Sequence, residues 1–214
     1  MMQETKTLSH YRESLREKII VVAIEAFANE GIKAVKMDTI AHRLGISKRT
    51  LYEIYDNKED LITACIRWHQ ETRKRQMAQT IGADKNVIDI ILYIYKNKVE
   101  EFHNTNPLFY SDLEKYPRVL EQLATDRDEN ARSFMAFIER GVGEGFFRSD
   151  VDYHFVLMLF DAITRYIMQR HIYRRSSIED IFHNLVLVTF RGFCTQKGIE
   201  ALDESLKVHH QIRG

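Results

Sequence analysis

Residues that break a helix are scarce in this sequence. Its 214 residues include only two prolines and nine glycines, so long segments run without a residue that interrupts a helix. Runs of β-branched residues alternating with polar residues, which would indicate half-buried strands, are also few. These absences favour an all-α protein over a sheet-rich fold.

The sequence also has few cysteines, and it lacks a signal peptide and long apolar runs. Cys65 and Cys194 lie in separate predicted helices, which is typical of buried thiols in a reducing compartment, while a redox-sensing role stays open. The first residues show no charged region followed by an apolar run. No apolar run reaches the roughly 20 residues that span a bilayer. We therefore expect a cytoplasmic protein without a membrane partner.

An excess of either sign of charge is missing too, because 31 Lys and Arg residues balance 31 Asp and Glu residues. A protein that coats nucleic acid without regard to sequence would be basic as a whole. The cations are instead concentrated between residues 31 and 52, where Asp38 is the one acid. They are Lys33, Lys36, Arg43, Lys48 and Arg49. A neutral protein with a small basic face suits site-specific DNA binding.

Residues 37–52 have the pattern of two short helices joined by a tight turn. Ile40, Ala41 and Leu44 stand at helical spacing and predict an apolar face for the first helix. Gly45 follows at the position where a helix end commonly needs a left-handed residue. Ser47 can cap the second helix by accepting from a free backbone N–H. An amphipathic helix over residues 16–30, ended by Gly31, is predicted to precede this motif.

The second short helix opens with cations that helix stability does not explain. Lys48 and Arg49 lie in its first turn, where the helix macrodipole favours anions. Contacts with phosphates or bases would explain them, because a helix-turn-helix presents its second helix to the major groove of DNA. Glu53, on the same exposed side, could accept from a cytosine amino group or form an ion pair with Arg49. Both alternatives stay open at this stage.

With these motifs the chain resembles the tetracycline-repressor (TetR) family of bacterial regulators. The resemblance is specific over roughly residues 16–62, above all in the segment 45–61, and weaker at residues 141–150, which are similar to the family's break before its last two long helices. It implies that Lys48, Arg49 and Thr50 reach bases and nearby phosphates, and that Tyr52 and Lys58 grip the DNA backbone. The chain departs from the family at Lys36, where a capping Ser or Thr is usual: a lysine there can reach a phosphate of the DNA backbone but cannot cap the helix.

The rest of the sequence predicts further helices, about nine in all. They follow residues 58–79, 86–103, 108–115, 117–141, 152–173 and 178–195. We expect a DNA-binding domain over residues 10–57, a ligand-binding and dimerisation domain over 58–198 and a polar, loosely ordered tail over 199–214.

The last two predicted helices are apolar on more than one side, with uninterrupted apolar runs at residues 155–160 and 185–188. Such helices must bury two faces. Either both are central core helices, or one face of each packs on a second copy of the chain in a four-helix dimer interface. The second alternative, which the resemblance also implies, predicts these interface residues: Phe160, Ile163, Ile167, Phe182, Leu185, Val186 and Thr189.

The resemblance further implies a cavity for a small-molecule effector in the C-terminal domain. Pockets of this kind are lined by apolar and aromatic side chains. The candidates, for each of which plain core packing is the alternative, are Tyr95, Phe102, Phe109, Phe134, Phe137, Phe155 and Tyr166. Gly141, Gly143 and Gly145 fit no nucleotide fingerprint, and no metal-ligand spacing or nucleophile motif occurs. We therefore expect no cofactor, no metal and no enzyme activity.

Taken together, the sequence favours a DNA-binding transcriptional regulator, expected to be a homodimeric repressor that a small molecule releases from double-stranded operator DNA. One alternative is a DNA-binding protein of the same fold without an inducer, acting in chromosome organisation or through a protein partner. Another is an all-helical enzyme or carrier whose helix-turn-helix is incidental.

Overall fold

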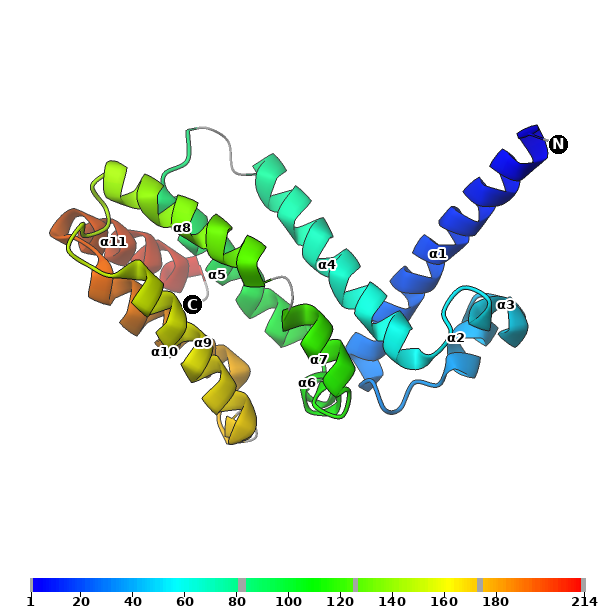
Figure 1. The fold of residues 1–214 in the computed structure, drawn as a ribbon. Helices are drawn as coiled ribbons and strands as arrows, with labels where there is room; N and C mark the ends of the chain where they lie inside the picture. Colours follow the sequence, from blue (N-terminus) through cyan, green and yellow to red (C-terminus); the bar gives the residue numbers. More distant parts are fainter. Residues whose placement is uncertain (1, 81–83, 125–126, 173–174, 213–214) are drawn as a thin grey trace. The chain divides into compact units, whose positions relative to one another are not determined.

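The computed structural model describes residues 2–80, 84–124, 127–172 and 175–212. It confirms the all-α prediction: the described residues form eleven helices, and their only β interaction is a single bridge between Phe147 and Cys194. The chain divides into two compact units, of which unit 1 comprises residues 1–80 and 104–126 and unit 2 comprises residues 81–103 and 127–214 (Figure 1). Within the described residues, no helix combines the length and apolar character needed to cross a membrane.

Unit 1 contains α1 (Met2–Glu30), α2 (Met37–Arg43), α3 (Lys48–Tyr52), α4 (Lys58–Thr80), α6 (Pro107–Leu113) and α7 (Pro117–Ala124). Ile19, Ala23 and Phe27 stand four residues apart on α1, so they share one face of that helix, and all three are buried. Ile40 of α2 and Leu51 of α3 are fully buried in the same core cluster. This shared core fixes α2 and α3 on the body of unit 1.

Residues 104–126 return to unit 1, so the compact units divide differently from the predicted domains, which meet between residues 57 and 58. Asn106 donates from its backbone N–H to Ala28 O at 2.7 Å and from Nδ2 to Asn29 O at 3.0 Å. These bonds satisfy carbonyls in the last turn of α1, which have no partner within the helix. Val119 of α7 is fully buried in the core of unit 1. The region that holds the helix-turn-helix is therefore larger than its sequence motif.

Asp112 of α6 fastens the loop that joins α1 to α2. Its Oδ2 accepts from the Lys33 backbone N–H at 2.7 Å, and its Oδ1 lies 2.8 Å from Lys115 Nζ. Burial alone would raise the pKa of Asp112, but the hydrogen bonds from Lys115 and from the Lys33 amide outweigh it and lower the pKa. The ionised carboxylate is thus the form that the fold stabilises.

Replacing Asp112 should therefore destabilise unit 1 in a pH-dependent way. Asp112→Ala leaves the Lys33 N–H without its acceptor, and we expect a loss of about 1–3 kcal/mol at neutral pH. Because the folded pKa is depressed, this contribution is present above the unfolded value and is lost as the pH falls through the folded pKa. Urea unfolding at several pH values measures the difference. The exposed Asp56, substituted to Ala, is the control, and an equal effect of both variants would contradict the assignment.

Unit 2 contains α5 (Val87–Asn104), α8 (Arg127–Gly143), α9 (Tyr153–Gln169), α10 (Ile178–Phe193) and α11 (Gln196–Ile212), apart from residue 104 at the end of α5. Its core is built around two aromatic rings, Phe147 and Phe193, whose centroids lie 5.3 Å apart in an edge-to-face arrangement. Tyr153 packs on Phe193 in the same way, at 5.5 Å.

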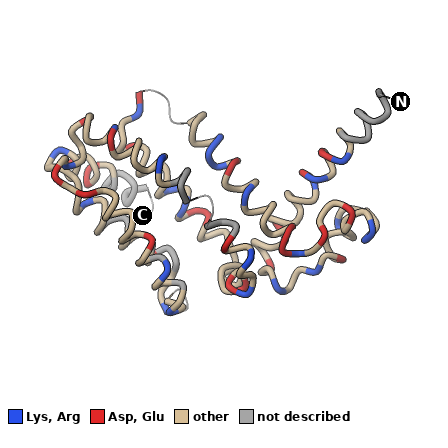
Figure 2. The backbone as a smooth tube through the Cα atoms, viewed as in Figure 1, with Lys and Arg blue, Asp and Glu red and all other residues tan. Residues whose placement is uncertain are grey.

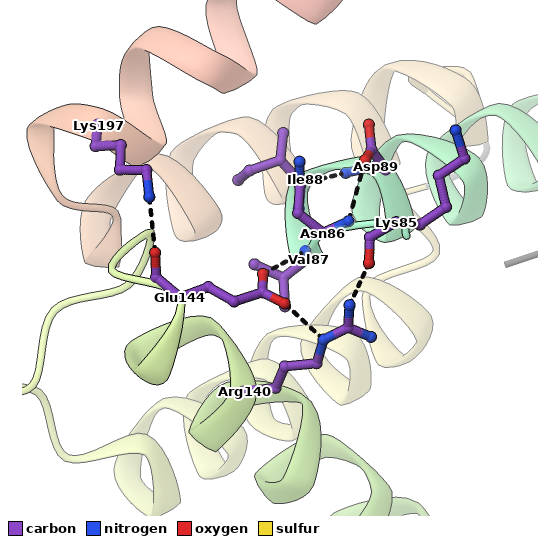
Figure 3. A network of polar contacts seen from close by, with 8 residues as sticks. All are labelled: Lys85, Asn86, Val87, Ile88, Asp89, Arg140, Glu144 and Lys197. Atoms are coloured by element: carbon purple, nitrogen blue, oxygen red, sulfur yellow. Dashed lines mark hydrogen bonds and ion pairs between the residues drawn. The ribbon is translucent and has the colours of Figure 1, made fainter. Parts of the chain in front are cut away.

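A polar network at one end of unit 2 ties three helices together (Figure 3). The Glu144 carboxylate accepts from the Val87 backbone N–H at 3.0 Å and from Arg140 Nε at 2.6 Å. Arg140 also donates to the carbonyl of Lys85, and Lys197 of α11 donates to the Glu144 carbonyl at 2.8 Å. One residue thus satisfies an N–H in the first turn of α5 and joins the ends of α8 and α11.

Three sequence predictions about helices need correction. The helix expected over residues 117–141 is two helices, α7 and α8, and α1 begins at Met2 rather than at residue 16. The segment from Ile199, expected to be loosely ordered, belongs to α11 through residue 212. Leu202 is fully buried in unit 2, and Thr195 Oγ1 accepts from the Gly198 N–H at 3.2 Å. A few apolar residues at helical spacing anchor this otherwise polar segment.

Gly198 lies in the first turn of α11 and packs closely against a backbone carbonyl. A Cβ atom at this position would lie 2.2 Å from the carbonyl oxygen of Phe146, which cannot move as a side chain can. Gly198→Ala should therefore destabilise unit 2 by about 1–3 kcal/mol. Gly143→Ala is the matched control, because a Cβ there meets nothing within 4 Å. Thermal unfolding of both variants measures the effect, and equal melting temperatures would contradict the close packing seen here.

Both cysteines are buried, and they lie in different units. Burial raises the pKa of Cys194 to about 11 and raises that of Cys65 beyond the range of ordinary thiols. Because the thiolate is the reactive form, these environments disfavour a redox-sensing role for either residue.

Candidate nucleic-acid interface

The turn between α2 and α3 has the geometry of a helix-turn-helix. Gly45 has a φ of +64°, in the left-handed region that glycine adopts without a steric cost. The N–H groups of Gly45 and Ile46 donate to the carbonyls of His42 and Ala41, both at 3.1 Å, and so close the end of α2. Ser47 Oγ accepts from the Thr50 N–H at 3.0 Å and caps α3, as predicted. Local contacts therefore fix the direction in which α3 leaves the turn.

The short helix α3 has one buried face and one exposed face. Leu51 is fully buried, and Ile54, just beyond the helix, packs against the same core. The side chain of Arg49 is 89% exposed, and Lys48, Tyr52 and Glu53 are also exposed, while Thr50 is half-buried. The outward face thus carries most of the residues predicted to contact DNA.

The two cations of α3 are each paired with an acid, and Figure 2 shows residues of both signs of charge along the α2–α3 part of the chain. Lys48 forms an ion pair with Asp38 of α2. Arg49 Nε lies 2.9 Å from Glu53 Oε1. The ion pair with Arg49, one of the two roles predicted for Glu53, is therefore present in the structure. Exposed pairs of this kind are worth only about 0.2–1 kcal/mol each, so DNA can displace them.

Lys36 and Lys58, both predicted to contact the DNA backbone, have different surroundings. Lys36 is exposed and extended at the N-cap of α2, where its side chain makes no capping bond. Lys58 is half-buried: its ammonium donates to Ile32 O at 2.5 Å and lies 5.8 Å from the Phe27 ring centroid. Burial lowers the pKa of Lys58. A phosphate contact by Lys58 would compete with these internal contacts, whereas Lys36 is available without such a rearrangement.

Two arginines of α1, which are not among the residues predicted to contact DNA, lie beside the end of α3. Arg12 Nη2 donates to Glu53 O at 3.4 Å, and Arg16 Nη2 donates to Ile54 O at 3.5 Å. Arg16 also lies over the Tyr55 ring, at 5.7 Å from its centroid. In the sequence, a shared role of the two arginines is indicated only by their spacing of four residues, which places them on one exposed face of a helix. Cations near a helix C-terminus are favourable, so both stabilise the orientation of α3.

The seven residues predicted to line an effector pocket do not share one environment. Phe109 belongs to α6 and packs on the core of unit 1, whereas the other six belong to unit 2. Tyr95, Phe134 and Phe137 pack at the core of unit 2, and Tyr95 Oη lies 2.6 Å from His183 Nδ1. Phe102 is half-buried. Phe155 and Tyr166 are more than half exposed on α9, which places them on the surface of the single chain.

An apolar stripe runs along the exposed side of α9. It consists of Phe155, Met158, Leu159, Ile163 and Tyr166, and we call it the α9 stripe. Val188 of α10 is 74% exposed as well. Of the predicted interface residues, Ile163 belongs to the stripe, and the half-buried ones are Phe160, Ile167, Leu185 and Thr189. The side chains of Phe182 and Val186 lie outside the described residues.

Comparisons with known proteins agree with this geometry. Residues 19–65, which include α2, α3 and most of the α1 core face, match the family of bacterial regulatory proteins described as the tetR family. The transcriptional repressor KstR2 of Mycobacterium tuberculosis is 24% identical over 146 residues, which cover 65% of this chain and 72% of that protein. The transcriptional activator FasR of Mycolicibacterium smegmatis is 24% identical over 136 residues, 62% of each chain.

Two solved structures share the fold beyond the motif. A TetR-family regulator from Cytophaga hutchinsonii superposes with a TM-score of 0.63 at 14% identity, covering 87% of this chain and 98% of that one. A transcriptional regulator from Saccharomonospora viridis, solved in complex with choline, gives 0.64 at 14% identity, covering 86% and 100%. With the exposed α3, its turn and its cap already in place, these matches show that residues 19–65 carry the DNA-binding motif of the tetR family of bacterial regulatory proteins and that the chain has the fold of TetR-family regulators.

Proposed function

We propose that this protein is a homodimeric repressor of transcription that binds a specific operator through α3 and leaves it when a small molecule binds unit 2. The observation that carries this proposal is the exposed face of α3, where the Arg49 side chain is 89% exposed while Leu51 beside it is fully buried. A rigid short helix with an outward arginine can read base edges in the major groove. The remaining residues supply dimerisation and control.

The α9 stripe supports the dimer. Five large apolar side chains on one side of a helix are costly to leave in water, and each contributes about 1.5–3 kcal/mol when fully buried. A two-fold axis through the stripe would bury it against the same residues of a second copy. The dimer would then offer two copies of α3, and successive major grooves on one face of DNA lie about 34–36 Å apart. We therefore expect a palindromic operator.

Control by a small molecule rests on fold likeness and on the interior of unit 2. The similar regulator from Saccharomonospora viridis binds choline. In this chain the half-buried Tyr95–His183 pair places polar atoms among the apolar residues that surround the core of unit 2. An effector releases DNA only when it binds the DNA-free conformation more tightly than the bound one. We propose that such an effector acts here, in the cytoplasm, without chemical conversion of the effector.

Selection of DNA fragments from the source genome by the purified protein tests the proposal. We expect enrichment of fragments that share a palindromic sequence next to promoters, and lower transcription from those promoters when the protein is present. Small molecules related to the products of the neighbouring genes should then reduce binding to the enriched fragments. If transcription from those promoters is instead higher when the protein is present, the protein is an activator and not a repressor. Recovery of unrelated fragments in genomic proportion would contradict sequence-specific binding altogether.

A further inference from the structure

The ion pair between Arg49 and Glu53 on the exposed face of α3 uses only the Nε donor of the arginine. Glu53 Oε1 accepts from Arg49 Nε at 2.9 Å. Among the described residues, the two terminal amino groups of the Arg49 guanidinium have no hydrogen-bond partner. The bidentate contact of arginine with O6 and N7 of guanine uses two of the donors at that outer end. Arg49 can therefore remain paired with Glu53 while it reads a guanine.

A phosphate would meet the same pair differently. Each phosphate carries a negative charge, so the acid beside the cation repels it and offsets much of the attraction. A base edge carries no net charge, and the second carboxylate oxygen of Glu53, Oε2, could accept from a neighbouring cytosine N4 amino group. The Lys48–Asp38 pair is also exposed, with side chains 65% and 48% exposed, and should reduce phosphate attraction in the same way.

We propose that Glu53 and Asp38 are specificity-determining residues, which hold Arg49 and Lys48 in neutral pairs and so lower the affinity for DNA of any sequence. Glu53 has a second role as a positioning residue, because its contact with Nε restricts the orientation of the exposed guanidinium. This inference rests on the proposed function. It predicts that the operator carries a guanine opposite Arg49.

The experiment compares Glu53→Gln and Asp38→Asn with the unaltered protein on two duplexes, the selected operator and an unrelated sequence of equal length. Asp56→Asn is the matched control, because Asp56 is an exposed acid of the same unit that has no ion-pair partner among the described residues. Fluorescence anisotropy titrations over a series of salt concentrations give the affinity for each duplex and the salt slope.

We expect Glu53→Gln and Asp38→Asn each to tighten binding to the unrelated duplex about three- to tenfold, because a dimer releases two cations and each exposed pair contributes modestly. The slope of log affinity against log salt should steepen by about 0.9 for each additional phosphate that the protein neutralises. Affinity for the operator should change less, so the ratio of the two affinities falls. Asp56→Asn should leave that ratio within about twofold of the unaltered protein.

Glu53→Ala separates the charge of Glu53 from its positioning role. Glutamine keeps an oxygen that can accept from Arg49 Nε, whereas alanine does not. Of the two Glu53 variants, we therefore expect only Glu53→Ala to weaken operator binding, by about tenfold.

Three results would overturn the inference. The first is an Asp56→Asn effect as large as those of the paired acids, which would reduce the effect to net charge. The second is tightening of both duplexes by the same factor. The third is equal operator affinity for Glu53→Gln and Glu53→Ala, which would remove the positioning role. In each case the proposed function stands as long as the unaltered protein prefers its operator. If it prefers no duplex, both proposals fall.

Discussion

Ile163→Asp should convert the proposed dimer to a monomer and weaken operator binding by about 100-fold or more. Ile163 lies within the α9 stripe, where an aspartate would be buried without a partner in the dimer, and a buried unpaired charge is costly. A monomer also loses the second copy of α3. Two linked binding sites commonly bind about 10²–10⁴-fold more tightly than one, so the loss of about 100-fold is the lower end of the expected range. Analytical ultracentrifugation and operator titration measure the two effects.

A matched variant makes the result specific to the stripe. Ser149→Asp adds the same charge at an exposed position between α8 and α9, outside the stripe. It should leave both the sedimentation coefficient and the operator affinity unchanged. If Ile163→Asp sediments like the unaltered protein, the α9 stripe is not the dimer interface, whatever its effect on DNA binding.

Arg49→Gln should weaken operator binding by about 1–3 kcal/mol for each half-site, the usual discrimination of a bidentate arginine–guanine contact. Binding to an unrelated duplex should weaken far less, because there Arg49 supplies only general electrostatic attraction that Glu53 already offsets. Competition titrations with the operator and the unrelated duplex measure the two losses separately.

Arg43→Gln is the control for charge alone. Arg43 is an exposed cation of α2 that is paired with Glu30 at 2.6 Å, so its removal changes the net charge of unit 1 by the same amount. A loss confined to Arg49→Gln and to the operator supports base recognition. Equal losses on both duplexes would reduce Arg49 to a phosphate contact.

The helix-turn-helix could be predicted from the sequence because its determinants are local. Gly45 takes the left-handed conformation and Ser47 caps α3, and each acts within three residues of its own position. The alternation of buried and exposed positions around Leu51 follows from helical periodicity alone. A single sequence contains all of this information, and the family resemblance adds the expected roles.

The contacts that sequence reasoning missed join residues far apart in the chain. Asp112 meets Lys33 across 79 residues, and Arg12 reaches the end of α3 across 41 residues. Lys58 shows the same limit, because its bond to Ile32 O depends on how the α1–α2 loop passes α4. In α11, the polar composition concealed Leu202, one residue whose burial anchors the helix. Local patterns predict helices, whereas long-range packing decides which side chains remain available.

Protection of guanine N7 against dimethyl sulfate tests the central claim, that α3 lies in the major groove with Arg49 at a base edge. Guanine N7 faces that groove, so a reagent that methylates it reports directly on occupancy there. We predict that the unaltered protein protects one guanine in each operator half-site and that Arg49→Gln, at saturating concentration, leaves that guanine reactive. Protection that is identical in both proteins, or is absent from the major groove, would contradict the account.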